Sequence, residues 1–312
     1  MMRITLLILP LVILLLSASR PATAFRARGA ADSERVFPAA ARLYFDPADQ
    51  QILAEKIACC DPAQPLPARV LAVAQSFLGV SYAQGLLDQS AEEQLTLNLR
   101  GLDCWTFVEY SLAIALAADV EAPAEAFPQY VQQLRYRGGK IAGYGSRLHY
   151  FSSWLAQAQA LGYLLDITGE LPGAAVFRKP VNYMSTHPDA YPALKNPEIR
   201  RQIDTTERLL SLQQRYFIPQ QRVQAMESAI QDGDLIAITS GKPGLDIAHE
   251  GFAVRVNGRV HLLHASSLAK RVVISAQPLA EYLIAQRGQT GIWVSRLGAK
   301  AAPTPSSEAP GR

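Results

Sequence analysis

Cysteine, histidine and net charge are all scarce in this chain of 312 residues. It holds three cysteines and five histidines, and its formal net charge is only +3. Three cysteines cannot build a disulfide framework, and an odd number leaves at least one free thiol even in an oxidising compartment. So small a net charge gives no reason to expect a nucleic-acid partner. Because apolar residues make up 49% of the chain, a sizeable core can form.

Long hydrophobic runs are lacking after the first residues. The run from Ile4 to Leu16 follows the basic Arg3 and precedes the small residues Ala22-Thr23-Ala24, which is typical of a secretory signal peptide. The run is short for a transmembrane span. We therefore expect residues 1–24 to be a cleaved signal peptide and the mature protein to begin at Phe25. The expected product is exported, periplasmic or cell-envelope, and soluble, without a stable membrane anchor; an uncleaved N-terminal anchor is the alternative.

The mature chain shows no internal repeat and no linker. Residues 25–42 are rich in Arg, Ala and Ser and predict a flexible lead-in, and residues 299–312 predict a disordered tail. Residues 43–298 therefore predict a single folded domain. The neighbouring Cys59 and Cys60 are not expected to form a disulfide with each other, since such a bridge is strained, and they are interpreted as the end of an apolar helix.

Helical patterns dominate the first half of this domain. Asp46-Pro47 is a helix-start signal, and apolar residues recur at helical spacing in four later segments: 70–78, 104–118, 123–136 and 154–161. Alternating Leu95-Thr96-Leu97-Asn98-Leu99 predicts a short strand. From Leu171 to Gln231 the pattern is irregular apart from a helical stretch at Arg208–Gln214, so we expect an elaboration of the core without a run of strands.

Strand patterns dominate the last third. Predicted strands cover 235–238, 249–256, 260–264, 272–274 and 292–294, with a short helix at 279–285. Asn257-Gly258 is a strong hairpin signal between the second and third of these strands. Helices first and strands later indicate an α+β fold, in which the N-terminal helices pack on a C-terminal antiparallel sheet built from Leu235 onward.

Cys104 lies where a polar turn passes into a helix that is apolar on most faces. Asp103 is a plausible N-cap for that helix. A thiol at a helix N-terminus is close to unpaired backbone N–H groups and to the positive end of the helix dipole, and both favour the thiolate. Cys104 is therefore a candidate nucleophile; a buried structural cysteine is the alternative.

Two histidines mark the ends of the predicted hairpin. His249 opens its first strand and His264 closes its second, so the two imidazoles are expected to be neighbours. If the N-terminus of the Cys104 helix packs against that sheet, the three side chains supply a thiol, a base and a group that orients the base. Ordinary strand-end histidines are the alternative.

Several motifs in this order resemble one family of enzymes. The segment Leu102-Asp103-Cys104-Trp105-Thr106-Phe107-Val108-Glu109 looks like the cysteine motif of the NlpC-type, papain-like cell-wall hydrolases. It is most similar to the N-acetylmuramoyl-L-alanine amidase-like branch. Further matching segments, spanning roughly Leu43 to Leu297, are Arg147–Phe151, Met184–Pro188, Gly233–Ile236, Asp246–Phe252 and His264–Ser267.

The resemblance implies a papain-like catalytic domain over 43–298 that acts on peptidoglycan or muropeptides without a cofactor. It implies Cys104 as nucleophile, His249 as base and His264 as the orienting group. Tyr82 corresponds to a tyrosine near the oxyanion in related enzymes, and a packed aromatic is its alternative role. Trp105 departs from the family pattern, which has a smaller or β-branched residue there, and could narrow the cleft.

Substrate contacts are predicted at Arg147, Asn182, Ser185 and His187. Arginine can bind the carboxylates of a muropeptide in a bidentate way, although a structural salt bridge from Arg147 to Glu109 or another acid is the alternative. Glu109 is expected to brace the site, and His187 before Pro188 could simply stiffen a loop.

Three other functions compete with a cysteine amidase that cleaves between N-acetylmuramic acid and L-Ala. The same Cys/His site could serve a stem-peptide endopeptidase. A zinc amidase could use His187, His249 and His264 as ligands, but their spacing fits no compact zinc motif and leaves Cys104 without a role. A non-catalytic wall-binding protein has no need of the cysteine and histidines. The sequence leaves the scissile bond and the oligomeric state open.

Overall fold

The computed structural model describes residues 43–90 and 92–298. The predicted signal peptide 1–24, the lead-in 25–42 and the tail 299–312 lie outside the described residues. All the described elements belong to one compact unit, and the domain limits proposed from the sequence stay predictions. None of the described helices is long and apolar enough to cross a bilayer.

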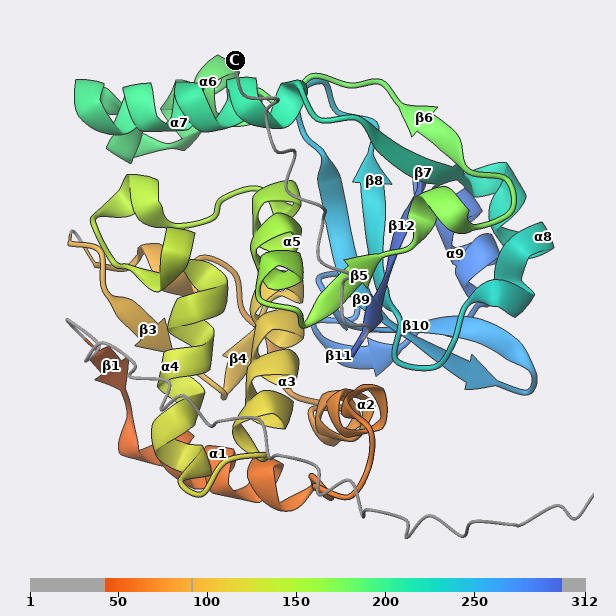
Figure 1. The fold of residues 1–312 in the computed structure, drawn as a ribbon, viewed down its shortest axis with the longest axis horizontal. Helices are drawn as coiled ribbons and strands as arrows, with labels where there is room; N and C mark the ends of the chain where they lie inside the picture. The colour runs from red at the N-terminus through yellow and green to blue at the C-terminus, as the bar shows by residue number, and fades with distance from the viewer. Residues whose placement is uncertain (1–42, 91, 299–312) are drawn as a thin grey trace, which may run out of the picture. The chain divides into compact units, whose positions relative to one another are not determined.

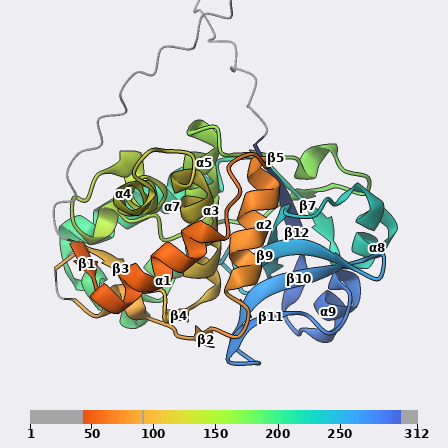
Figure 2. The same cartoon turned by 90° about the horizontal axis from the view of Figure 1, so that it is seen from below.

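Helices fill the first half of the described chain, as predicted. Asp46 caps the first helix by accepting a hydrogen bond from the backbone N–H of Ala48. In Figures 1 and 2, α1 to α5 lie together on one side of the sheet. The α-helices of the described residues are α1 (Pro47–Ala58), α2 (Leu66–Ser76), α3 (Cys104–Ala117), α4 (Pro123–Arg135), α5 (Phe151–Ala160), α6 (Tyr183–Thr186), α7 (Pro197–Ser211), α8 (Val223–Met226) and α9 (Leu279–Ala285).

The strands of the described residues are β1 (Leu43–Phe45), β2 (Ser81–Tyr82), β3 (Leu95–Leu97), β4 (Gly101–Leu102), β5 (Leu164–Asp166), β6 (Ala175–Phe177), β7 (Arg215–Pro219), β8 (Leu235–Ser240), β9 (Ile247–Val256), β10 (Arg259–Ser266), β11 (Arg271–Ile274) and β12 (Gln289–Leu297). The large sheet has the order β4-β2-β11-β10-β9-β8-β12-β7-β6, with β5 paired to β12, while β1 and β3 form a separate parallel pair.

The predicted hairpin is confirmed. Strands β9 and β10 pair antiparallel with Val256 opposite Arg259. The turn residues Asn257 and Gly258 have φ of 50° and 82°, and two consecutive positive φ values are the requirement of the tight hairpin turn that Asn-Gly favours.

Helices cover both faces of the sheet. On one face α3 packs against β9, where the rings of Phe107 and Phe252 lie 5.8 Å apart. On the other face Leu279 and Leu283 of α9 join a buried cluster with residues of β8, β9, β10 and β12. Helix α3 is buried almost all round, so its first residue has a fixed position relative to the sheet.

Three expectations about the sheet and the middle region are wrong. The region after Leu171 supplies two strands, β6 and β7, that extend one edge of the sheet. Its helix begins at Pro197, well before the predicted Arg208, because Asn196 caps it through the N–H groups of the first turn. The sheet is also not purely antiparallel or confined to residues after Leu235, since β2 and β4 add a parallel pair.

Candidate active site

Cys104 is the first residue of α3, and a capping box fixes that position. The Asp103 carboxylate accepts a hydrogen bond from the backbone N–H of Thr106 at 2.8 Å. In return the Thr106 hydroxyl accepts one from the backbone N–H of Asp103 at 3.0 Å. The predicted N-cap is confirmed, and the helix start holds the thiol at the edge of a buried element.

Tyr82 and Glu250 lie beside this thiol. Strand β2 runs parallel to β4 with Tyr82 opposite Leu102, two residues before the cysteine. Burial and the neighbouring Cys104 and Asp103 raise the pKa of Tyr82 to about 12, so its phenol is a neutral hydrogen-bond donor. The thiol is within hydrogen-bonding reach of the side chain and of the backbone of Glu250 in β9.

The expectation that the thiolate is favoured is wrong for this arrangement. Burial, followed by the charges of Glu250 and Asp103, raises the pKa of Cys104 well above its usual value. The helix N-terminus does not overcome these contributions. Cys104 is a partly buried residue, and its thiol is protonated in the resting site.

The two imidazoles are neighbours, as predicted. His249 Nε2 and His264 Nδ1 are 2.5 Å apart in a hydrogen bond, and the rings meet at 83°. Burial lowers the pKa of His249 to about 4, and burial together with His249 lowers the pKa of His264 to about 3. Both rings are therefore neutral near pH 7.

The thiol and the imidazoles are related through intervening residues, with no hydrogen bond between them among the described residues. Glu250, which contacts Cys104, is the residue after His249. Tyr282 of α9 has its ring 5.4 Å from that of His264, and its pKa also responds to Cys104. In the described part of the chain neither imidazole hydrogen-bonds the thiol, so the catalytic roles of these residues stay predictions.

Arg147 forms salt bridges, although not with the predicted partner. Its guanidinium contacts Asp88 at 2.5 Å and Glu93 at 3.3 Å. Glu109 instead bonds Arg135 at 2.5 Å in a fully buried pair, which agrees with a bracing role. Arg147 also lines a cavity of about 1190 Å³, whose wall includes Tyr144, Tyr183 and Tyr191.

Asn182 and His187 line a second cavity, of about 520 Å³, together with Lys179 and Lys242. The His187 ring stacks on Tyr183 with centroids 4.1 Å apart. Its Nδ1 lies 2.8 Å from the Tyr183 carbonyl, so the ring is held by its own short helix.

Ser185 does not line either cavity. Its backbone N–H donates to Glu207 at 3.0 Å, and its hydroxyl donates to the Asn182 carbonyl at 3.2 Å. The structure thus divides the predicted substrate contacts: Arg147 belongs to the first cavity, Asn182 and His187 to the second, and Ser185 supports the backbone between them.

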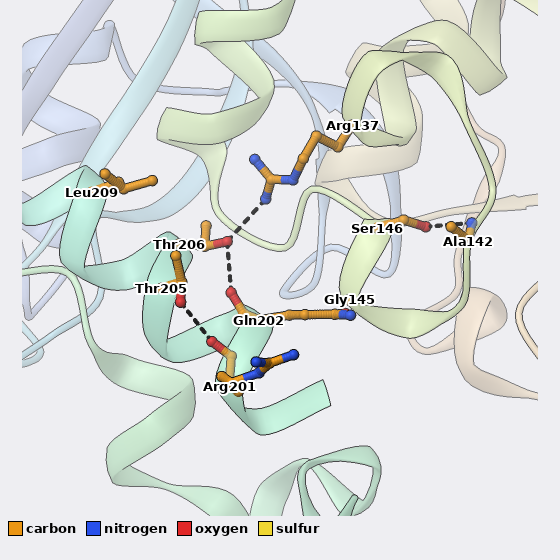
Figure 3. Close-up of a pocket in the computed structure, with 9 residues that line it drawn as sticks. All are labelled: Arg137, Ala142, Gly145, Ser146, Arg201, Gln202, Thr205, Thr206 and Leu209. Carbon is orange, nitrogen blue, oxygen red and sulfur yellow. Dashed lines mark hydrogen bonds between the residues drawn. The ribbon is translucent and has the colours of Figure 1, made fainter. Parts of the chain in front are cut away.

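A third cavity, of about 530 Å³, contains none of the predicted site residues. In Figure 3, Gln202, Thr206 and Leu209 of α7 line it opposite Arg137. Arg137 donates a hydrogen bond to the Thr206 hydroxyl at 2.9 Å. This cavity is therefore a groove beside α7, separate from the residues around Cys104.

The zinc alternative has no ligand set in the described ranges 43–90 and 92–298, where no group of three or more His, Cys, Asp or Glu side chains is arranged to hold a metal ion. Of its three proposed ligands, His249 and His264 bond each other. His187 is held on Tyr183 instead.

Glu250 and Tyr282 were missed at the sequence level. Alternation along β9 gives the signal for Glu250: it shares a strand face with Phe252, which packs on α3. An acid at such a core-facing position is unusual. For Tyr282 the sequence carries no comparable signal, because its contact with His264 depends on how α9 packs.

Comparisons with known proteins identify a family for this chain. The model of the N-acetylmuramoyl-L-alanine amidase-like family matches residues 72–292. The structure is similar to an N-acetylmuramoyl-L-alanine amidase from Bacteroides uniformis, with 39% identity and a TM-score of 0.69, over 73% of this chain and 98% of that one. A Bacteroides fragilis protein provisionally named a xylanase is 38% identical, with a TM-score of 0.68 over 72% and 99% of the two chains.

A more distant structure, from Legionella pneumophila, shares the fold at 23% identity, with a TM-score of 0.59 over 80% of this chain and 94% of that one. No curated protein matches. The family match covers well over half of the chain, and the Bacteroides relatives are covered almost completely. This chain belongs to the N-acetylmuramoyl-L-alanine amidase-like family.

Proposed function

We propose that this chain is an exported cysteine hydrolase that cleaves the amide bond between N-acetylmuramic acid and L-Ala in peptidoglycan. The observation that carries the proposal is the place of Cys104. In this member of the amidase-like family, Cys104 is the first residue of a capped core helix. Its thiol is close to Glu250, the residue that follows His249. The name of the Bacteroides uniformis relative supports the choice of bond.

The same arrangement supports a papain-like, NlpC-type fold. A helix that begins with the cysteine packs on a mainly antiparallel sheet. The adjacent strands β9 and β10 carry the two hydrogen-bonded histidines. These are the parts that the cysteine mechanism needs: a thiol, a base and a group that holds the base.

In the proposed first step, the Cys104 sulfur forms a bond to the amide carbonyl carbon while its proton passes to His249. The imidazole of His249 is neutral near pH 7 and can accept that proton. His264, bonded to the same ring, fixes its orientation and stabilises the positive charge that develops.

The carbonyl oxygen becomes negative in this step, and Tyr82 can donate a hydrogen bond to it together with the backbone N–H of Cys104. We expect Tyr82→Phe to lower kcat about 10²-fold with little change in KM, because the bond is made only in the transition state. Steady-state hydrolysis of a defined muropeptide measures this. Tyr216→Phe, in β7 and 38% exposed, is the control and should keep its rate. A Tyr82→Phe enzyme with wild-type kcat would assign Tyr82 to packing alone.

The tetrahedral intermediate then collapses. The C–N bond breaks, the proton held by His249 passes to the leaving nitrogen, and the peptide leaves with L-Ala at its new N-terminus. Water, deprotonated by His249, attacks the thioester and releases the lactyl carboxylate of N-acetylmuramic acid with the free thiol.

The two cavities around Tyr183 are candidates for holding the rest of the muropeptide. The one lined by Asn182 and His187 also presents Lys179 and Lys242 and no acidic residue. Ammonium groups in such a cavity would attract the carboxylates of a stem peptide. In the larger cavity Arg147 already has acidic partners, so its role there would be to shape the wall.

Mass spectrometry of muropeptides digested by the purified protein tests the function, with Cys104→Ala as the blank. The proposal expects sugar products that end in a free lactyl carboxylate and peptides that begin with L-Ala. Fragments cut within the stem would support the endopeptidase alternative instead. Intact muropeptides in both samples would contradict a hydrolytic function on this substrate.

Export is proposed from the first 24 residues alone. The apolar run Ile4–Leu16 and the small residues Ala22-Thr23-Ala24 support cleavage after Ala24. N-terminal sequencing of the protein recovered from the cell envelope should therefore begin at Phe25. A sequence that begins at Met1 would contradict the cleavage.

A further inference from the structure

The short segment Asn182–His187, which contains α6, borders both cavities around Tyr183. Asn182 and His187 line the cavity of about 520 Å³, and Tyr183 lines both this cavity and the one of about 1190 Å³. Helix α6 has only four residues, so its own hydrogen bonds are too few to hold it in place. The shape of both cavities therefore depends on what the rest of the fold does to fix this segment.

The start of α6 lacks the cap that a helix usually has. Asn182 is in the N-cap position, yet its side chain makes no capping hydrogen bond. The first N–H groups of a helix have no partner within the helix and need one from elsewhere. Those of Asn182 and Tyr183 donate to the carbonyl of Gly244, in the turn between β8 and β9, at 3.0 and 3.1 Å. The next two N–H groups, of Met184 and Ser185, need another acceptor.

Glu207 of α7, the helix beside α6 in Figure 1, supplies that acceptor. Its Oε1 atom accepts a hydrogen bond from the backbone N–H of Ser185 at 3.0 Å and another from the Tyr150 hydroxyl at 2.6 Å. The Tyr150 hydroxyl in turn accepts one from the backbone N–H of Met184 at 2.8 Å. A single carboxyl oxygen thus takes the place of the missing cap, directly for Ser185 and through one hydroxyl for Met184.

The surroundings of Glu207 make these bonds its main stabilisation. Glu207 and Tyr150 are only 3% and 2% exposed. Glu109, Glu227 and Asp234 are buried acids that each pair with an arginine. Among the described residues no cation forms a salt bridge with Glu207. A buried carboxyl is costly unless it is hydrogen-bonded, so the carboxyl and its two donors hold one another in place.

We propose that Glu207 is a positioning residue for substrate binding, which fixes the segment Asn182–His187 where it borders the two cavities. Glu207 itself lines neither cavity, so it acts on a bound muropeptide only through that segment. None of its hydrogen-bond partners takes part in the proposed chemistry at Cys104. Its effect should therefore fall on substrate affinity and not on the chemical step. Only this effect on affinity rests on the proposed function; the fixing of the segment does not.

Amide hydrogen exchange, followed by NMR, tests the fixing of the segment without any substrate. Glu207→Ala removes the acceptor of the Ser185 N–H, and we expect that amide to exchange about tenfold faster, the effect of losing one hydrogen bond. Glu207→Gln keeps an acceptor oxygen in nearly the same shape and should stay close to the wild-type rate. Tyr150→Phe removes the acceptor of the Met184 N–H and should accelerate exchange there. It also serves as the second variant if Glu207→Ala is poorly folded.

Calorimetry on the inactive Cys104→Ala protein tests the effect on affinity, with a defined muropeptide as the probe. We expect Glu207→Ala to raise Kd about tenfold in this background and Glu207→Gln to leave it nearly unchanged. In the protein that keeps Cys104, we expect Glu207→Ala to raise KM about tenfold and to keep kcat within about twofold, since only binding is weakened.

Glu227→Ala is the matched control. It removes another buried acid, whose partners are Arg259 and the backbone N–H of Val260, and which makes no bond to the segment Asn182–His187. Loss of a buried acid in general should lower the thermal midpoint in both variants. Faster exchange at Ser185 and a higher Kd are expected from Glu207→Ala alone. Thermal unfolding checks that every variant is folded.

Wild-type exchange at Ser185 in a folded Glu207→Ala protein, or at Met184 in a folded Tyr150→Phe protein, would overturn the proposal. So would a Glu207→Gln variant that exchanges as fast as Glu207→Ala, or a kcat that falls while Kd and KM stay constant. Faster exchange with an unchanged Kd would remove the role in substrate binding. If the wild type neither binds nor hydrolyses the muropeptide, the proposed function fails, while the exchange rates still decide whether Glu207 fixes the segment.

Discussion

Cys104→Ala is expected to abolish muropeptide hydrolysis, with a loss of about 10⁴-fold or more in turnover. Without the sulfur no thioester can form, and the remaining groups can only polarise the substrate and position water. Cys104→Ser should lose activity to a similar degree, because a hydroxyl in this buried, acidic surrounding is a far poorer nucleophile than a thiol. Release of new N-termini from a defined muropeptide measures the loss.

The serine variant also separates chemistry from folding. The swap is nearly isosteric, and the Asp103–Thr106 capping box that starts α3 does not involve the thiol, so we expect the thermal midpoint to change little. Cys59→Ser is the matched control. Cys59 is an exposed thiol at the end of α1 and should keep wild-type turnover. A Cys104→Ser enzyme with wild-type turnover would exclude the cysteine mechanism.

Local signals in the sequence were enough to predict the parts that carry the candidate chemistry. Asp103 predicted the start of α3, Asn257-Gly258 predicted the β9–β10 hairpin, and the pairing of that hairpin brought His249 and His264 together. Each of these depends on neighbours within a few residues or on one tight turn. They could therefore be read without knowing the rest of the fold.

Strand order and salt-bridge partners between distant segments could not be predicted in the same way. Strand β12 comes last in the chain yet lies between β8 and β7, because the strand pattern fixes which residues face the core and not which strand is the neighbour. From the sequence, Glu109 was an alternative salt-bridge partner for Arg147. In the structure Glu109 forms its salt bridge with Arg135 instead. Which acid and which base meet depends on how α3, α4 and the η1 turn (Leu86–Asp88) pack.

The prediction of a Cys104 thiolate was wrong for a related reason. The sequence shows a helix N-terminus, which favours thiolate by a modest amount. It does not show that β9 places the carboxyl of Glu250 close to the same sulfur. Burial and that carboxyl outweigh the helix end, and the result is a thiol that must lose its proton to a base during the reaction. His249 is therefore needed in the chemical step itself, not only to prepare the nucleophile.

His249→Ala is accordingly expected to lower turnover about 10⁴-fold, the upper end of what a general base supplies. His264→Ala should lose less, about 10²-fold, because the His264 side chain orients His249 through one hydrogen bond and exchanges no proton with the substrate in the proposed steps.

His261→Gln is the matched control. It lies on the same strand, β10, and bonds the Ser275 carbonyl, so it should keep its turnover if the variant folds. All three are compared by single-turnover hydrolysis at several pH values, after thermal unfolding has shown that they are folded. Wild-type turnover in His249→Ala would exclude it as the base, and a greater loss in His264→Ala than in His249→Ala would reverse the two roles.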